Sequence, residues 1–90
     1  MKEIIINVSD CTTALQFLAV VSKALGKLIG TFSMLNQYLL TNHYSKITFL
    51  NMKDFSARCP QAMKELEVVL KRVQWHYQQE GNGFEYYFQP

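Results

Sequence analysis

Hydrophobic and polar residues alternate at both ends of the chain. Near the start, "KEIIINV" (2–8) places alternate residues, from Ile4 to Val8, on one side of an extended segment. The segment "FEYYF" (84–88) alternates in the same way. β-Branched and aromatic residues with a period of two are typical of half-buried strands. Together with "SKITFLN" (45–51), which has a similar composition, these segments predict three strands.

Between the first two strands, the apolar residues recur at helical spacing. Leu15, Leu18 and Leu25 predict a helix over 13–25 with these residues on its buried side. Gly26 follows at the position where a helix commonly ends in the left-handed conformation, which glycine adopts without steric cost. The first helix is therefore expected to end there.

A second helix is expected after a short connector. Either Thr31 or Ser33 can cap its N-terminus, because a hydroxyl oxygen there accepts a hydrogen bond from an unpaired backbone N–H. Leu35 and Leu39 then lie on one side of the helix. The pattern predicts that this helix ends near residue 42.

The clearest helical pattern follows Pro60, a residue that suits the first turn of a helix because its missing N–H would have been unpaired there. Its apolar residues recur every three or four positions and are Met63, Leu66, Leu70, Val73 and Tyr77. A short helical turn through "DFSARC" (54–59), capped by Asn51 or Ser56, is expected before it. The segment "EGNG" (80–83) ends the long helix.

This order of elements contains two crossovers between parallel strands, and such crossovers are right-handed in nearly all known cases. With the strands in sequential order 1-2-3, both crossovers place their helices on one face of the sheet. We therefore expect an α/β fold with two layers, a three-stranded parallel sheet and a single domain over 1–90. The open face carries Ile5, Thr48 and Tyr87 and offers a surface for pairing with a second copy, so we expect a monomer or a weak homodimer.

The composition is that of a compact globular protein, with 49% hydrophobic and 18% charged residues. Nine Lys and Arg against seven Asp and Glu give a net charge of +2, spread along the chain. There is thus no concentrated field to attract nucleic acid or a membrane surface. Glu3 and Asn7 interrupt the start, and the longest apolar run is "FLAVV" (17–21), so we expect no export signal and no membrane span.

Two cysteines and two histidines are the candidates for catalysis or metal binding. Cys11, His43, Cys59 and His76 are separated by 16 to 32 residues, without the close spacing of zinc ligands. We expect no catalytic site, no metal and no cofactor, and we interpret the cysteines as reduced thiols of a cytoplasmic protein. The spacing leaves open a Cys–His pair or a disulfide formed by folding.

The segment "GKLIGTFSMLNQYLL" (26–40) contains two of the four glycines. A phosphate-binding loop of the Walker type needs an earlier glycine, a Gly-Lys pair and then Ser or Thr, directly after a strand. Here Leu28 follows the Gly-Lys pair, the earlier glycine is absent, and a helix precedes the segment. The glycines instead fit a connector between helices. It has more apolar residues than a connector needs, which favours partner binding.

The order of elements resembles that of the barstar family, small intracellular inhibitors of secreted ribonucleases. The similarity covers nearly the whole chain, from "KEIIINV" through "LIGTFSMLNQYLLTN" and "KITFLNMKDF" to "FEYYF". In that family the loop and second helix block the nuclease active site with acidic residues and aromatics. The resemblance therefore implies a barstar-like fold that binds its partner through this region. Residues 26–44 contain no Asp or Glu and carry Lys27 and His43, so inhibition of a basic ribonuclease by charge does not carry over.

Together these patterns predict a small protein-binding module, an inhibitor, immunity or adaptor protein that engages another protein, such as a toxin or nuclease, through residues 27–38. Its expected contacts are apolar anchors, two side-chain amides and an adjoining tyrosine, namely Leu28, Ile29, Phe32, Met34, Tyr38, Asn36, Gln37 and Tyr44. The alternative is a protein that binds single-stranded nucleic acid with scattered Lys and Arg and with surface tyrosines. Those tyrosines are Tyr38, Tyr44, Tyr86 and Tyr87.

Overall fold

Strands and helices follow one another in the predicted order. The computed structural model describes residues 2–90. Its elements are β1 (Glu3–Asn7), α1 (Ala14–Leu25), α2 (Phe32–Thr41), β2 (Lys46–Leu50), α3 (Met52–Arg58), α4 (Pro60–Gln79) and β3 (Glu85–Phe88). The observed bounds differ from the predicted ones by no more than two residues.

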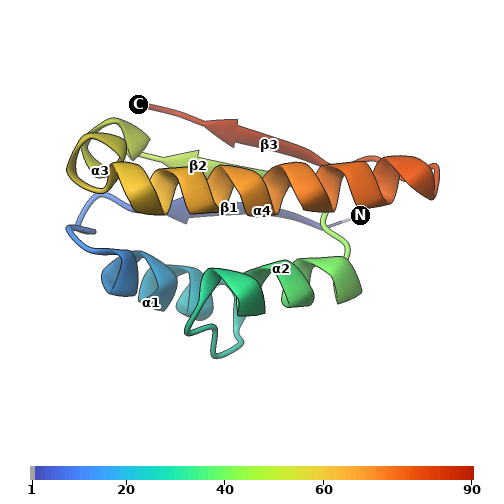
Figure 1. The fold of residues 1–90 in the computed structure, drawn as a ribbon, viewed down its shortest axis with the longest axis horizontal. Helices are drawn as coiled ribbons and strands as arrows, with labels where there is room; N and C mark the ends of the chain where they lie inside the picture. The colour runs from blue at the N-terminus through green and yellow to red at the C-terminus, as the bar shows by residue number, and fades with distance from the viewer. Residues whose placement is uncertain (1) are drawn as a thin grey trace.

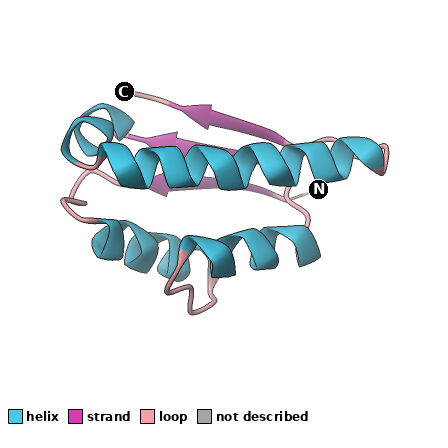
Figure 2. Ribbon diagram, in the orientation of Figure 1, coloured by secondary structure: helices cyan, strands magenta, loops and turns pink. Residues whose placement is uncertain are grey.

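The three strands form a parallel sheet in the order β1-β2-β3, with the helices packed against it (Figures 1 and 2). Ile4 of β1 is the register partner of Ile47 in β2, which in turn is the partner of Tyr86 in β3. Because the order of strands in the sheet follows the chain, both connections cross on the same side. The predicted two-layer α/β fold with a three-stranded parallel sheet is confirmed.

The two faces of the sheet differ in burial. On the face that the helices cover, Ile6 and Phe49 are buried in the core. On the other face Ile5 and Tyr87 are exposed, while Thr48, which lies between them in the register, is buried. Two neighbouring strand spacings separate β1 from β3 by about 10 Å. The open face therefore presents two separate apolar side chains rather than a continuous apolar surface.

Threonine caps fix where α1 and α2 begin. Thr13 Oγ1 accepts a hydrogen bond from the N–H of Gln16 at 3.1 Å. Thr31 Oγ1 does the same for the N–H of Met34 at 3.0 Å, which makes Thr31 the cap of α2. Gly26 ends α1 with φ 68° and ψ 28°, in the left-handed region, as the sequence predicts.

Phe17 of α1 lies at the centre of the core. Its ring packs against the rings of Phe55, Phe49 and Phe32, with centroids 4.7, 5.9 and 6.1 Å away. Leu15, which the sequence places on the buried side of this helix, is instead 75% exposed. The larger ring of Phe17 faces the sheet, and Leu15 lies about 160° around the helix axis from it.

Tyr77 joins α4 to the C-terminal end of α2. Its hydroxyl donates to the carbonyl oxygen of Leu39 at 2.6 Å, and the carbonyl oxygen of Leu40 lies 3.2 Å away. These are among the last carbonyls of α2, which have no partner within the helix. Burial, and to a smaller extent the charge of Glu80, raises the pKa of Tyr77, so the hydroxyl keeps its proton and remains a donor. The ring of His43 packs on that of Tyr77 with centroids 4.3 Å apart.

Replacing Tyr77 by phenylalanine is expected to lower the free energy of unfolding by about 1–2 kcal/mol, because it leaves a buried carbonyl without its donor. Urea denaturation measures the change. The control is Tyr87→Phe, whose ring is exposed on the open sheet face and whose effect should stay within about 0.5 kcal/mol. Equal stabilities of the two variants would contradict the role assigned to Tyr77.

Candidate functional site

The loop between α1 and α2 is held against α1 by hydrogen bonds. The N–H of Lys27 donates to the carbonyl oxygen of Ser22 at 3.1 Å. The Ser22 hydroxyl oxygen accepts from the N–H of Ile29 at 2.9 Å, and it lies 3.0 and 2.7 Å from the carbonyl oxygens of Ile29 and Leu18. The Ser22 hydroxyl oxygen thus accepts from the N–H of Ile29, and its single proton lies between the carbonyl oxygens of Leu18 and Ile29. The loop is therefore fixed on the helix layer.

Leu28 and Ile29 point in opposite directions from this loop. Ile29 is 2% exposed and belongs to the core, whereas Leu28 is 81% exposed. Both residues were predicted to contact a partner, but the side chain of Ile29 is enclosed by the protein, so Leu28 is the one whose side chain is exposed. Because Ile29 is fixed by its hydrogen bond to Ser22 and by burial of its side chain, Leu28 before it points into solvent.

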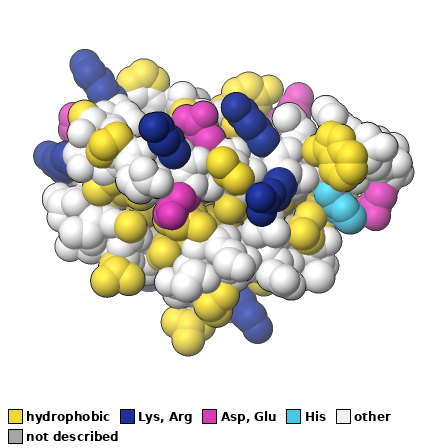
Figure 3. Space-filling view, in the orientation of Figure 1, with side chains coloured by type: hydrophobic (Ala, Val, Ile, Leu, Met, Phe, Trp, Pro, Cys, Tyr) yellow, Lys and Arg dark blue, Asp and Glu magenta, His cyan; other side chains and the backbone are white. Residues whose placement is uncertain are grey.

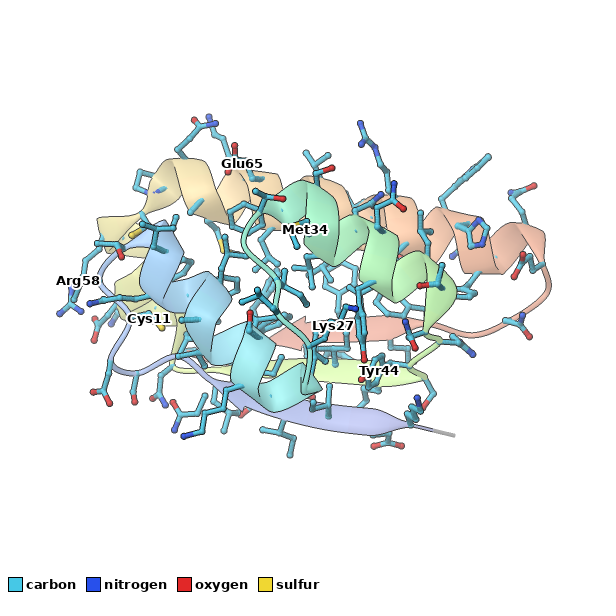
Figure 4. The ribbon with its side chains drawn as sticks, turned by 90° about the horizontal axis from the view of Figure 1, so that it is seen from below. Cys11, Lys27, Met34, Tyr44, Arg58 and Glu65 are labelled. Carbon is cyan, nitrogen blue, oxygen red and sulfur yellow. The ribbon has the colours of Figure 1, made fainter. Side chains whose placement is uncertain are left out.

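A groove of about 480 Å³ separates Leu28 from α2. Met34, Gln37 and Tyr38 line it on the α2 side, and Lys27 lines it on the loop side. In Figure 4, Lys27 marks the loop and Met34 the first turn of α2. Five of the predicted contact residues therefore line one groove, namely Leu28, Ile29, Met34, Gln37 and Tyr38.

A second groove of about 330 Å³ lies on the other side of Leu28, against α1. Leu15 and Ala19 of α1 line it together with Leu28. We call the exposed surface of Leu15, Leu28 and Met34 the apolar ridge. In Figure 3 hydrophobic side chains protrude along the lower edge of the molecule, over α1 and the α1–α2 loop. Leu15 was not among the predicted contacts. The bulkier Phe17 two residues later was the feature that indicates an exposed Leu15, because the two side chains cannot both face the sheet.

Phe32, Asn36 and Tyr44 do not line the apolar ridge. Phe32 and Asn36 lie on the opposite side of α2, next to α4. Tyr44 is buried, and its hydroxyl oxygen lies 3.4 Å from that of Tyr38. The Tyr38 hydroxyl also donates to the carbonyl oxygen of Leu25 at 3.4 Å. Tyr44, which was predicted as a contact, therefore lies in the core and supports α2 from within.

The apolar ridge carries little charge. Of the residues that line the two grooves beside it, Lys27 is the one with a charged side chain at neutral pH. His43 is directed elsewhere, since its Nε2 lies 2.6 Å from the carbonyl oxygen of Gly83. The ridge is thus an apolar surface with a single cation at its edge.

The cysteines and histidines have separate surroundings. Cys11 and Cys59 are free thiols; burial raises the pKa of Cys11, and Cys59 Sγ donates to the carbonyl oxygen of Thr12 at 3.3 Å. His76 Nε2 lies 3.3 Å from the carboxylate of Glu80. Within residues 2–90, no three His, Cys, Asp or Glu side chains are grouped so that they can hold a metal ion. No helix in that part of the chain is both long enough and apolar enough to cross a membrane.

The four tyrosines that could stack bases differ in exposure. Of the four, Tyr87 is exposed, Tyr44 is buried, and Tyr38 and Tyr86 are half-buried against the core. Lys46 Nζ lies 5.6 Å from the ring centroid of Tyr87. The structure therefore does not bring these four rings together at the surface.

No family model, curated protein or solved structure matches this chain. The case for its function therefore depends on the geometry and chemistry of its own residues.

Replacing Ser22 by alanine should loosen the α1–α2 loop. The change removes the acceptor of the Ile29 N–H, so we expect a loss of about 1–2 kcal/mol of stability and amide exchange at Ile29 that is faster by about tenfold or more. Hydrogen exchange followed by NMR measures both effects. The matched control is Ser33→Ala at an exposed position on α2, which should leave exchange at Ile29 unchanged. Unaltered exchange at Ile29 in the Ser22 variant would rule out the bracing role.

Tyr44 gives the fold a dependence on high pH. Burial, followed by the hydrogen bond and charge of Tyr38, raises the pKa of Tyr44 from 10.0 to about 12. As the pH rises, the unfolded chain therefore loses the Tyr44 proton before the folded protein does. The contribution of Tyr44 to stability is intact below pH 10 and is lost between about 10 and 12. In urea denaturation across that range, Tyr44→Phe should lose stability less steeply than the wild type. Parallel declines would show that Tyr44 does not titrate in this way.

Proposed function

We propose that this chain is a small protein-binding module of the inhibitor, immunity or adaptor kind, and that the apolar ridge is its contact surface. The observation that carries the proposal is Leu28, which is 81% exposed although it lies on a loop that hydrogen bonds hold in place. The rigid backbone keeps this leucine side chain in water. Covering it with a partner therefore lowers the free energy of the complex. Exposed apolar groups on loops of a rigid scaffold are a common binding device.

The energetics favour binding through this surface. Complete burial of a leucine side chain is worth about 1.5–3 kcal/mol. Because Ser22 and the Gly26 cap already order the loop, little conformational entropy is lost when a partner docks. The grooves on both sides of Leu28 receive side chains of the partner, and Gln37 on α2 offers an amide for hydrogen bonds at the rim.

The charge of the ridge indicates the chemistry of the partner. Lys27 beside an apolar surface suits a partner with an apolar patch and a neighbouring carboxylate or carbonyl oxygen. A toxin with such a surface fits, whereas the cationic active site of a basic ribonuclease would be repelled by Lys27. The barstar-like character of the protein remains part of this proposal, supported by the order of elements and the sequential parallel sheet.

The proposed role is binding without a cofactor, in the cytoplasm. The two free thiols support a reducing compartment. Of the two cysteines, Cys11 is buried and its pKa is raised, which disfavours the thiolate that a nucleophile needs. These features favour a binding role over a catalytic one.

The test compares the wild type with a variant of the ridge and a control variant. Each form is used to capture a partner from a cytoplasmic extract of the source cells, and calorimetry then measures its affinity for the purified partner. Leu28→Ser combined with Met34→Ser should weaken binding by about tenfold or more, since each removes apolar area that the partner covers. Both side chains are exposed, so the thermal unfolding of this variant should match that of the wild type.

The control is Ile5→Thr, which removes an exposed apolar side chain from the open sheet face and keeps a β-branched residue in the strand. It should bind the partner as the wild type does. If the Leu28/Met34 variant binds the same protein as tightly as the wild type, the ridge is not the contact surface.

A further inference from the structure

The two cysteines lie at the same end of the folded protein, although they are far apart in the sequence. Cys11 lies in the loop between β1 and α1, and Cys59 lies between α3 and α4. The Sγ of Cys59 donates to the carbonyl oxygen of Thr12, the residue after Cys11, at 3.3 Å. In Figure 4, Cys11 and Arg58, the residue before Cys59, are labelled at one end of the molecule. Folding therefore brings the second thiol to the backbone beside the first.

The two thiols also act on each other electrostatically. Burial is the largest cause that raises the pKa of Cys11, and the charges of Asp10 and Cys59 raise it further. Asp10 precedes Cys11 in the chain, so its effect is local. Cys59 is distant in the sequence, and charges on a protein in salt solution influence each other appreciably only over about 10 Å. The effect of Cys59 therefore agrees with the hydrogen bond to Thr12 in placing the two sulfur atoms near each other.

Backbone hydrogen bonds hold both cysteines in position. The N–H of Cys11 donates to the carbonyl oxygen of Val8 at 3.0 Å, which closes a turn after β1. The N–H of Cys59 donates to the carbonyl oxygen of Phe55 at 2.8 Å, and its own carbonyl oxygen accepts from the N–H of Met63 at 3.0 Å. Two groups that the fold already holds near each other react with little further ordering of the chain. The geometry therefore favours a bond within one chain over a bond between two chains.

The two thiols differ in their access to solvent. Cys11 is 2% exposed, whereas Cys59 is half-buried. A small oxidant therefore reaches Cys59 first. Cys11 is shielded from the oxidant and is placed to react with an oxidised Cys59.

We propose that Cys11 and Cys59 are a redox-sensitive pair, which closes to a disulfide when the protein meets hydrogen peroxide. The bond ties the start of α1 to the junction between α3 and α4. In a reducing compartment both thiols stay free, as they are in the structure.

The oxidation takes two steps. The Cys59 thiolate attacks one oxygen of hydrogen peroxide, the O–O bond breaks, and Cys59 becomes a sulfenic acid while hydroxide leaves. The Cys11 sulfur then attacks the Cys59 sulfur, so that the S–S bond forms and the S–OH bond breaks. The proton that each thiol loses combines with a departing hydroxide. The two thiols thus lose two electrons, and the peroxide is reduced to two molecules of water.

The disulfide is expected to change stability and to leave the apolar ridge unchanged. It closes a long loop that contains α1, α2, β2 and α3. Disulfides stabilise a protein mainly by restricting the unfolded chain, and the effect grows with the length of the loop. We therefore expect the oxidised protein to unfold at a temperature about 10 °C higher. The loop that carries Leu28 lies at the other end of α1, after Gly26.

The experiment treats the reduced, full-length protein at low concentration with hydrogen peroxide and counts its thiols by alkylation and mass spectrometry. The expected product is lighter by two hydrogen atoms and has no thiol left to alkylate. Proteolysis without reduction should give a peptide with Cys11 linked to a peptide with Cys59. The temperature of thermal unfolding should rise, and dithiothreitol should restore the value of the reduced protein.

Two variants assign the two steps. Cys11→Ala keeps Cys59 and removes its partner, so peroxide should leave a sulfenic acid at Cys59 that dimedone traps, without a rise in the unfolding temperature. In Cys59→Ser the buried Cys11 thiol should stay reduced at the peroxide concentration that closes the wild type. Circular dichroism confirms that each reduced variant is folded.

The proposal is overturned if the treated wild type keeps both thiols, if its disulfides join two chains, or if the Cys11–Cys59 bond forms only after urea unfolds the protein. It is also overturned if the linked protein unfolds at or below the temperature of the reduced one. Leu28→Ser should form the same disulfide as the wild type, so this result does not depend on the ridge being a contact surface.

Discussion

Right-handed crossovers between parallel strands in sequential order confine the helices to one face of the sheet. This constraint places α2 beside α4 and beyond the loop that follows α1. α2 buries Leu35 and Leu39 toward the core and keeps two free flanks. One flank faces Leu28 across the first groove, and the other borders the groove along α4. Both grooves are consequences of this position.

Hydrogen bonds at the two ends of this arrangement keep it in place. Ser22 holds the loop at Ile29, and Tyr77 supplies a donor to the last carbonyls of α2. Each bond joins a helix to backbone that has no regular partner, where an unpaired group would be costly. The apolar ridge consequently has a fixed shape in the folded protein.

Local patterns in the sequence determined the elements and their order: Gly26 ends α1, Thr31 begins α2, and the period of each segment distinguishes strand from helix. Handedness places both crossovers on one face once the strand order is 1-2-3, but the order itself was decided by the tertiary structure. Local patterns did not show which of two adjacent apolar residues would be buried and which exposed. Leu28 is exposed and Ile29 is buried, and this depends on how the loop folds back on Ser22, a contact between residues seven apart. Tertiary packing alone decided which apolar side chains became core and which became surface, because burial depends on what lies across from a side chain rather than on its own polarity.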